Sequence, residues 1–97
     1  MANMDVATAI FSQIRYTTKM ACAARDFVGD DDRLWFRVSI APRKFHKIEV
    51  VLDPSDTYTV KLYLISNKIG SDYIVEDERE GVYADSLNEV VYRMCNR

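Results

Sequence analysis

The hydrophobic and polar positions follow a helical period at both ends of the chain. From Met4 to Ala24 the apolar residues fall near one face of a helix. These residues are Val6, Ile10, Ile14 and Ala21, with Phe11 and Met20 beside them. Towards the other end, the i, i+3, i+4, i+7 positions are Leu87, Val90, Val91 and Met94. The pattern predicts one helix at each end.

Between residues 33 and 65 the period changes to 2, which is typical of strands with one buried face. Three segments alternate in this way, with inward positions Leu34, Phe36, Val38 and Ile40, then Ile48, Val50 and Leu52, then Tyr58, Val60, Leu62 and Leu64. Turns are expected at 41–44, 53–56 and 67–70. A short fourth strand at Tyr73 to Val75 is optional in this scheme, and Glu76 to Glu80 is expected to be an acidic link.

Short connections between the strands favour an antiparallel meander whose apolar face is covered by the two helices. The expected fold is therefore α+β, with a three- to four-stranded antiparallel sheet in the order α-β-β-β(-β)-α. The 97 residues, 48% of them apolar and 29% charged, have an ordinary globular composition and leave room for one core. We expect a single domain over residues 1–97.

The two cysteines and the chain start bear on the compartment. Cys22 and Cys95 each fall in a predicted helix without metal-ligand spacing, so two buried free thiols are expected, and a disulfide is the alternative in an oxidising compartment. Residues 1–5 lack a basic start followed by an apolar run, and no stretch approaches the roughly 20 apolar residues of a membrane span. We expect a cytoplasmic protein.

Most residue patterns that support catalysis are missing from the sequence. His46 is the one histidine, and it has no neighbouring ligand spacing for a metal site. The three glycines are isolated, so no phosphate-binding loop is predicted. Nothing supports a nucleophile with a paired base. We expect a protein that binds, that is not an enzyme and that needs no cofactor.

Charge is segregated along the chain behind a net value of −2. Residues 26–32 hold acids without bases, residues 33–47 hold bases without acids, and residues 72–97 are again mainly acidic. In one interpretation the basic block binds nucleic acid, with phosphates at Arg37, Arg43, Lys44 and Lys47 and with Trp35 or Phe45 stacking on bases. In another, the acids stand in for phosphates and occupy a basic groove on a partner. In a third, the blocks are solvated loops that pair with one another.

Two segments resemble a group of small phage and prophage proteins. They are Asp56 to Tyr63, with a D-T-Y-x-V stretch, and Gly81 to Leu87, which reads G-V-Y-A-D-x-L before the closing helix. The group also has a loop like Phe27-Val28 before a strand like Leu34 to Arg37. The resemblance implies a phage context. In size and acidic clusters the chain is also similar to anti-CRISPR proteins that mimic DNA.

These features lead to a ranked expectation for function. The first is an inhibitor of host defence inside the bacterial host, which blocks a nucleic-acid-binding groove of a CRISPR surveillance complex or another host protein. Its contact residues are Asp30, Asp31, Asp32, Glu76, Asp77, Glu78 and Glu80, and it requires both acidic clusters on one face. The alternatives are a nucleic-acid-binding accessory protein that uses Trp35, Arg37, Arg43, Lys44 and Lys47, and a phage structural or assembly subunit. No contact with a membrane is expected.

Overall fold

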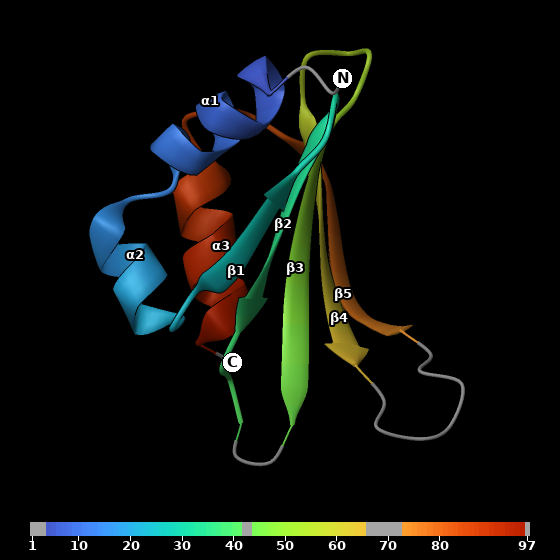
Figure 1. Ribbon diagram of the computed structural model, residues 1–97. Helices are drawn as coiled ribbons and strands as arrows, with labels where there is room; N and C mark the ends of the chain where they lie inside the picture. Colours follow the sequence, from blue (N-terminus) through green and yellow to red (C-terminus); the bar gives the residue numbers. More distant parts are fainter. Residues whose placement is uncertain (1–3, 42–43, 66–72, 97) are drawn as a thin grey trace.

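The computed structural model describes residues 4–41, 44–65 and 73–96 of the chain. Its helices are α1 (Asp5–Gln13), α2 (Tyr16–Ala21) and α3 (Leu87–Cys95), and its strands are β1 (Arg25–Gly29), β2 (Arg33–Val38), β3 (Phe45–Leu52), β4 (Tyr58–Ile65) and β5 (Tyr73–Val82). The strands form one antiparallel sheet in the order β1-β2-β3-β4-β5 (Figure 1). The α+β class and the meander are confirmed, but the sheet has five strands where three to four were expected.

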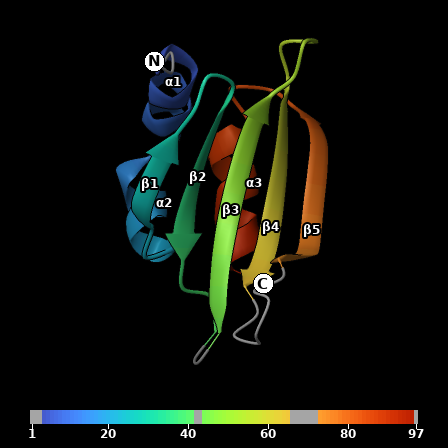
Figure 2. The ribbon, with the colours of Figure 1, turned by 45° about the vertical axis from the view of Figure 1, so that its right-hand side comes forward.

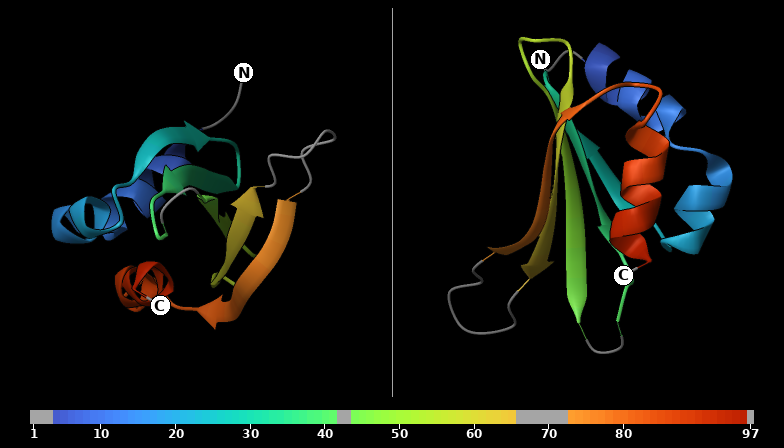
Figure 3. Two further views of the ribbon diagram at one scale, coloured as in Figure 1. Left: turned by 90° about the horizontal axis from the view of Figure 1, so that it is seen from below. Right: turned by 180° about the vertical axis from the view of Figure 1, so that it is seen from behind.

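All three helices lie on one side of the twisted sheet, as the two views in Figure 3 show. The inward positions of β2, β3 and β4 alternate as predicted, and they form the core with the apolar sides of α1 and α3. The most deeply buried large residues are Ile10, Ile14, Phe36, Ile48, Leu62, Leu87 and Met94. The opposite side of the sheet, seen in front of α3 in Figure 2, carries no helix; we call it the open face.

The two edge strands account for the difference in strand number. β1 occupies residues 25–29, where no strand was predicted. β5 runs through Glu76 to Glu80, so the expectation of an acidic link there is wrong. In β5 nine of ten residues are exposed or half-buried. Solvent reaches most side chains of these two edge strands, so their sequences lack the alternation that reveals β2, β3 and β4.

The expected N-terminal helix is broken into two shorter helices. Ile14 has an extended backbone conformation (ψ 117°) and is buried in the core. The next residue, Arg15, donates its backbone N–H to Asn88 Oδ1 at 2.7 Å, which ties the break to α3. Thr17 and Thr18 follow, and their β-branched side chains weaken helix propensity. The break lets the chain turn towards α3 at the base of the core.

Gly29, at the end of β1, sets how closely α1 approaches the β1–β2 hairpin. A Cβ atom at this position would lie 2.6 Å from Ala7 Cβ and 2.6 Å from Met4 Cε. A side chain here would therefore push α1 off the sheet. The hairpin and α1 pack together because this position lacks one.

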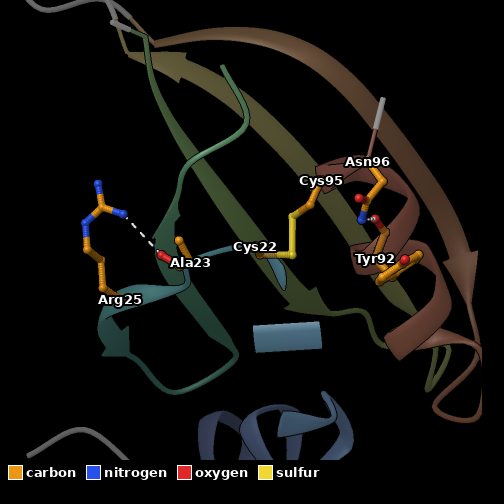
Figure 4. Close-up of a disulfide and its surroundings, with 6 residues drawn as sticks. All are labelled: Cys22, Ala23, Arg25, Tyr92, Cys95 and Asn96. Carbon is orange, nitrogen blue, oxygen red and sulfur yellow. Dashed lines mark hydrogen bonds between the residues drawn. A yellow bond between two sulfur atoms is a disulfide. The ribbon is translucent and has the colours of Figure 1, made fainter. Parts of the chain in front are cut away.

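Cys22 and Cys95 form a disulfide, so the expectation of two free thiols is wrong. Cys22 follows α2 and Cys95 ends α3, with their Cα atoms 5.5 Å apart (Figure 4). Cys22 is fully buried and Cys95 nearly so. The bond fastens the end of the N-terminal helical segment to the end of the C-terminal helix.

No helix in the described ranges is long and apolar enough to cross a membrane.

Candidate functional site

The open face carries a row of basic and aromatic side chains across three central strands. Arg37 of β2 lies opposite Lys47 of β3, and Lys47 lies opposite Tyr63 of β4. Directly paired residues on antiparallel strands have neighbouring side chains on the same face. Trp35, two residues before Arg37, is therefore on this face too, as the alternation predicted. The structure brings three of the five residues predicted to bind nucleic acid into one patch.

Lys47 lies between two aromatic rings at the centre of this patch. Its Nζ is 4.8 Å from the centroid of Trp35 and 5.1 Å from the centroid of Tyr73. The Tyr73 ring in turn meets Tyr63 edge to face, with centroids 5.9 Å apart. We call Trp35, Arg37, Lys47, Tyr63 and Tyr73 the aromatic–basic patch. A cavity of about 220 Å³ opens beside it, walled also by Asp26 and Val28.

Glu49 on β3 holds the side chain of Tyr63 in the patch through a hydrogen bond. It accepts a hydrogen bond from Tyr63 Oη at 3.2 Å and another from Arg33 Nη1 at 3.3 Å. Burial, together with the neighbouring Glu49 carboxylate, raises the pKa of Tyr63, so its hydroxyl stays a neutral donor at ordinary pH. The hydrogen bond ties the phenol of Tyr63 on β4 to Glu49 on β3.

The remaining residues of the predicted basic site are less central. Lys44 is exposed just before β3, at the end of the sheet where Arg37 and Lys47 lie. Arg43 lies outside the described residues. Tyr73 and Asp26 were not predicted as site residues from the sequence. Tyr73 joins the patch through the β4–β5 register, where it pairs with Ile65, and Asp26 lies beside the cavity at an irregularity in β1.

The two acidic clusters are not brought together. Asp30, Asp31 and Asp32 form the β1–β2 turn at one edge of the sheet, and the second cluster lies along β5 at the other. At about 4.8 Å between strands, β2 and β5 are roughly 14 Å apart. The twist of about 20–25° per strand turns them further, by roughly 60–75°. The structure therefore places the two acidic clusters at opposite edges of the sheet.

Most of these acids are paired within the chain. Asp32 accepts a hydrogen bond from Arg33 Nε at 2.9 Å, and this bond holds the pKa of the Asp32 carboxyl below its usual value. On β5 the pairs are Glu76 with His46, Asp77 with Arg79 and Glu78 with Lys61. The Glu76 contact is on the helix side, because His46 is in the core, whereas Lys61 is on the open face. The cluster on β5 is thus divided between the two sides.

His46, the one histidine, is buried at the helix side of β3. It is 4% exposed, and its Nε2 lies 2.6 Å from Glu76 Oε1. Its Nδ1 is buried without a hydrogen-bond partner. The contact with Glu76 crosses β4 and joins the centre of the sheet to the edge strand that carries Tyr73.

Replacing Glu76 with alanine should destabilise the fold, because it removes the partner of a buried imidazole nitrogen. We expect Glu76→Ala to lower the free energy of unfolding by about 1–3 kcal/mol. Glu76→Gln, which keeps an acceptor oxygen, should cost less. Glu80→Ala on the same strand serves as the control and should stay within about 0.5 kcal/mol of the wild type. Urea titrations followed by circular dichroism measure all three, and equal losses for Glu76→Ala and Glu80→Ala would contradict the assignment.

Among the described residues, no group of three or more His, Cys, Asp or Glu side chains is placed to hold a metal ion. No protein-family model, curated protein or solved structure matches the chain.

Proposed function

We propose that this protein binds single-stranded nucleic acid on the open face of its sheet, with bases stacked on the aromatic–basic patch. The observation that carries the proposal is the position of Lys47 between Trp35 and Tyr73 on a sheet face without a helix. Antiparallel sheets that present aromatic rings beside cations are suited to single strands, since splayed bases stack on the rings and phosphates meet the cations.

The energies of the competing contacts favour an incoming base. In the free protein Lys47 covers the rings of Trp35 and Tyr73, and at exposed sites each such contact contributes about 0.5–1 kcal/mol. A base stacked on an aromatic side chain contributes about 1–3 kcal/mol. Stacking therefore displaces the ammonium from the ring, and the freed Lys47 then reaches a phosphate of the same strand.

The shape of the molecule supports a single strand over a duplex. Reading a duplex requires a helix or a two-stranded ribbon that enters a groove. Here α1, α2 and α3 pack on the opposite side of the sheet, and the disulfide fastens α2 to α3. A sheet face with rings set among cations instead suits unpaired bases. The net charge of −2 keeps the affinity modest and makes the local cations Arg37, Lys44 and Lys47 decisive.

The stacking role of Trp35 gives a direct test. The chain has one tryptophan, so fluorescence that is excited selectively at tryptophan reports on Trp35 in the patch. We expect a saturable decrease in this fluorescence when an unstructured eight-nucleotide single strand is added at low salt. In a parallel titration with a fluorescein-labelled strand, Trp35→Ala should weaken binding by roughly 5- to 150-fold, which corresponds to the loss of one stacked base at about 1–3 kcal/mol.

Tyr16→Ala is the matched control for that experiment. Tyr16 is an aromatic residue on α2, 73% exposed and on the helix side of the molecule. Its replacement should leave the affinity unchanged. Equal affinities of the wild type and Trp35→Ala, or no binding of any strand at low salt, would refute the proposal.

A second candidate function keeps the acidic surface and the phage context, now restricted to the β5 edge. Acids occupy four of five consecutive positions there, Glu76 to Glu80, and residues in a strand rise about 3.3 Å each. Successive side chains point to opposite faces of a strand, so the acids on one side of β5 would stand in for phosphates. An inhibitor of a nucleic-acid-binding complex in a bacterial host, of the anti-CRISPR type, would use this acidic edge. This candidate would be favoured if the protein captured such a complex from the host and did not bind single-stranded nucleic acid on its own.

A further inference from the structure

An irregularity in β1 aims an acidic side chain at the cavity beside the aromatic–basic patch. The register of β1 against β2 shifts between Arg25 and Val28, and Asp26 within the shift has a left-handed backbone (φ 57°). β-Bulges bend a strand and redirect a side chain, often next to binding sites. Here the Asp26 carboxylate comes to line the cavity together with Trp35 and Arg37.

The cavity has the size of one heterocyclic base. Its volume is about 220 Å³. A cavity of about 150 Å³ in another protein accommodates benzene, whereas sites for drug-sized ligands start at about 300 Å³. Trp35 supplies a flat wall against which a planar ring can stack, and Val28 supplies an apolar side. A single base of a strand bound on the open face fits this space.

Asp26 supplies hydrogen-bond acceptors to the cavity, whereas Arg37 and Lys47 supply donors. Asp26 Oδ2 is 3.8 Å from Arg37 Nε, which is beyond hydrogen-bond length. The two side chains attract each other, but the carboxylate keeps its two acceptor oxygens and the guanidinium keeps its donors. Both are more than half exposed, at 63% and 53%, so a ligand can reach them from the open side.

Guanine is the base whose edges match this arrangement. Its N1–H and N2–H₂ groups are adjacent donors that a carboxylate accepts with two parallel hydrogen bonds. Its O6 and N7 are acceptors, and arginine is their common bidentate partner. Uracil and thymine offer one donor at N3, and adenine and cytosine offer one exocyclic amino group beside an acceptor that the carboxylate repels. The other three bases therefore lose at least one of the two hydrogen bonds to Asp26.

We propose that the cavity beside Trp35 selects guanine within the bound strand, with Asp26 accepting from N1–H and N2–H₂ and with Arg37 donating to the acceptor edge. The inference rests on the proposed binding of a single strand and adds its base preference. Because both side chains are partly exposed, we expect a preference of about tenfold for guanine over thymine, near the low end of the range for a bidentate base contact.

The test compares nine-nucleotide strands of thymidines whose central base is guanine, adenine, cytosine, thymine or hypoxanthine. Guanine should bind about tenfold tighter than thymine. Hypoxanthine, which lacks the 2-amino group, should lose most of that advantage. Asp26→Asn should abolish the preference, so that this variant binds all five strands with affinities within about twofold of one another. Asparagine tolerates the left-handed backbone, so this variant is expected to fold.

Asp30→Asn provides the matched control, since Asp30 is an acid of the same hairpin that does not line the cavity. It should keep the full preference for guanine. Equal affinities for the five strands, or a preference that survives Asp26→Asn, would overturn the inference while leaving single-strand binding intact. Failure of all strands to bind would instead refute the proposed function itself.

Discussion

Loss of the disulfide should lower the free energy of unfolding by about 4 kcal/mol, because the bond closes a loop with a sequence separation of 73 residues. The cross-link restricts the unfolded chain, and a loop of this length restricts it strongly. For a chain of 97 residues, each 1 kcal/mol changes the melting temperature by about 4–8 °C, so the loss corresponds to roughly 15–30 °C. Differential scanning calorimetry with and without a thiol reductant measures the effect.

The double variant Cys22→Ala/Cys95→Ala isolates the bond from other effects of the reductant. The double variant should have the same reduced melting temperature with and without the reductant. The wild type should reach that melting temperature only when the reductant is present. Since Cys22 is fully buried, reduction of the native protein requires opening of the contact between α2 and α3. A wild type whose melting temperature is the same with and without reductant would contradict the assigned role of the bond.

The second large effect is expected at Phe36, where replacement by alanine should cost about 3–5 kcal/mol. Phe36 is 1% exposed, and the centroid of its ring lies 5.0 Å from that of Phe27. It is also the inward residue between Trp35 and Arg37 on β2. The cavity left by Phe36→Ala should therefore loosen the strand that carries two residues of the aromatic–basic patch.

Phe45→Ala is a suitable control, because Phe45 is 43% exposed at the start of β3. Its replacement should cost less than about 1 kcal/mol. Urea denaturation of both variants gives the comparison, with an unchanged slope showing that the unfolded states are alike. Similar losses for the two phenylalanines would contradict the described core.

The central sheet could be predicted from the sequence because its strands have one buried and one open side. Because one side is buried, every second residue of β2 is apolar, as at Leu34, Phe36 and Val38, and β3 and β4 show the same alternation. β1 and β5 lie at the edges, where solvent reaches most side chains, so burial imposes no alternation on them. The break at Ile14 depends on a contact with Asn88, which is distant in sequence, and no local pattern reveals it.

The candidate site could be predicted only where a single strand determines it. Trp35 and Arg37 were placed on one face by their spacing alone. The contacts of Lys47 with Trp35 and Tyr73 depend on two strand pairings and on the β4–β5 register, which shifts twice. The position of Asp26 depends on an irregularity in the pairing of β1 with β2, and no sequence pattern predicted this irregularity. The pairing of Cys22 with Cys95 follows from how the helices pack, which the spacing of two cysteines does not determine.

The Cys22–Cys95 bond also changes what a protease can do to the molecule. All residues of β1 to β5 and nearly all of α3 lie between the two cysteines. A single backbone cut anywhere in this span leaves two pieces that remain covalently joined. Such a nicked protein keeps both halves of the sheet at high effective concentration, and its fragments separate after reduction.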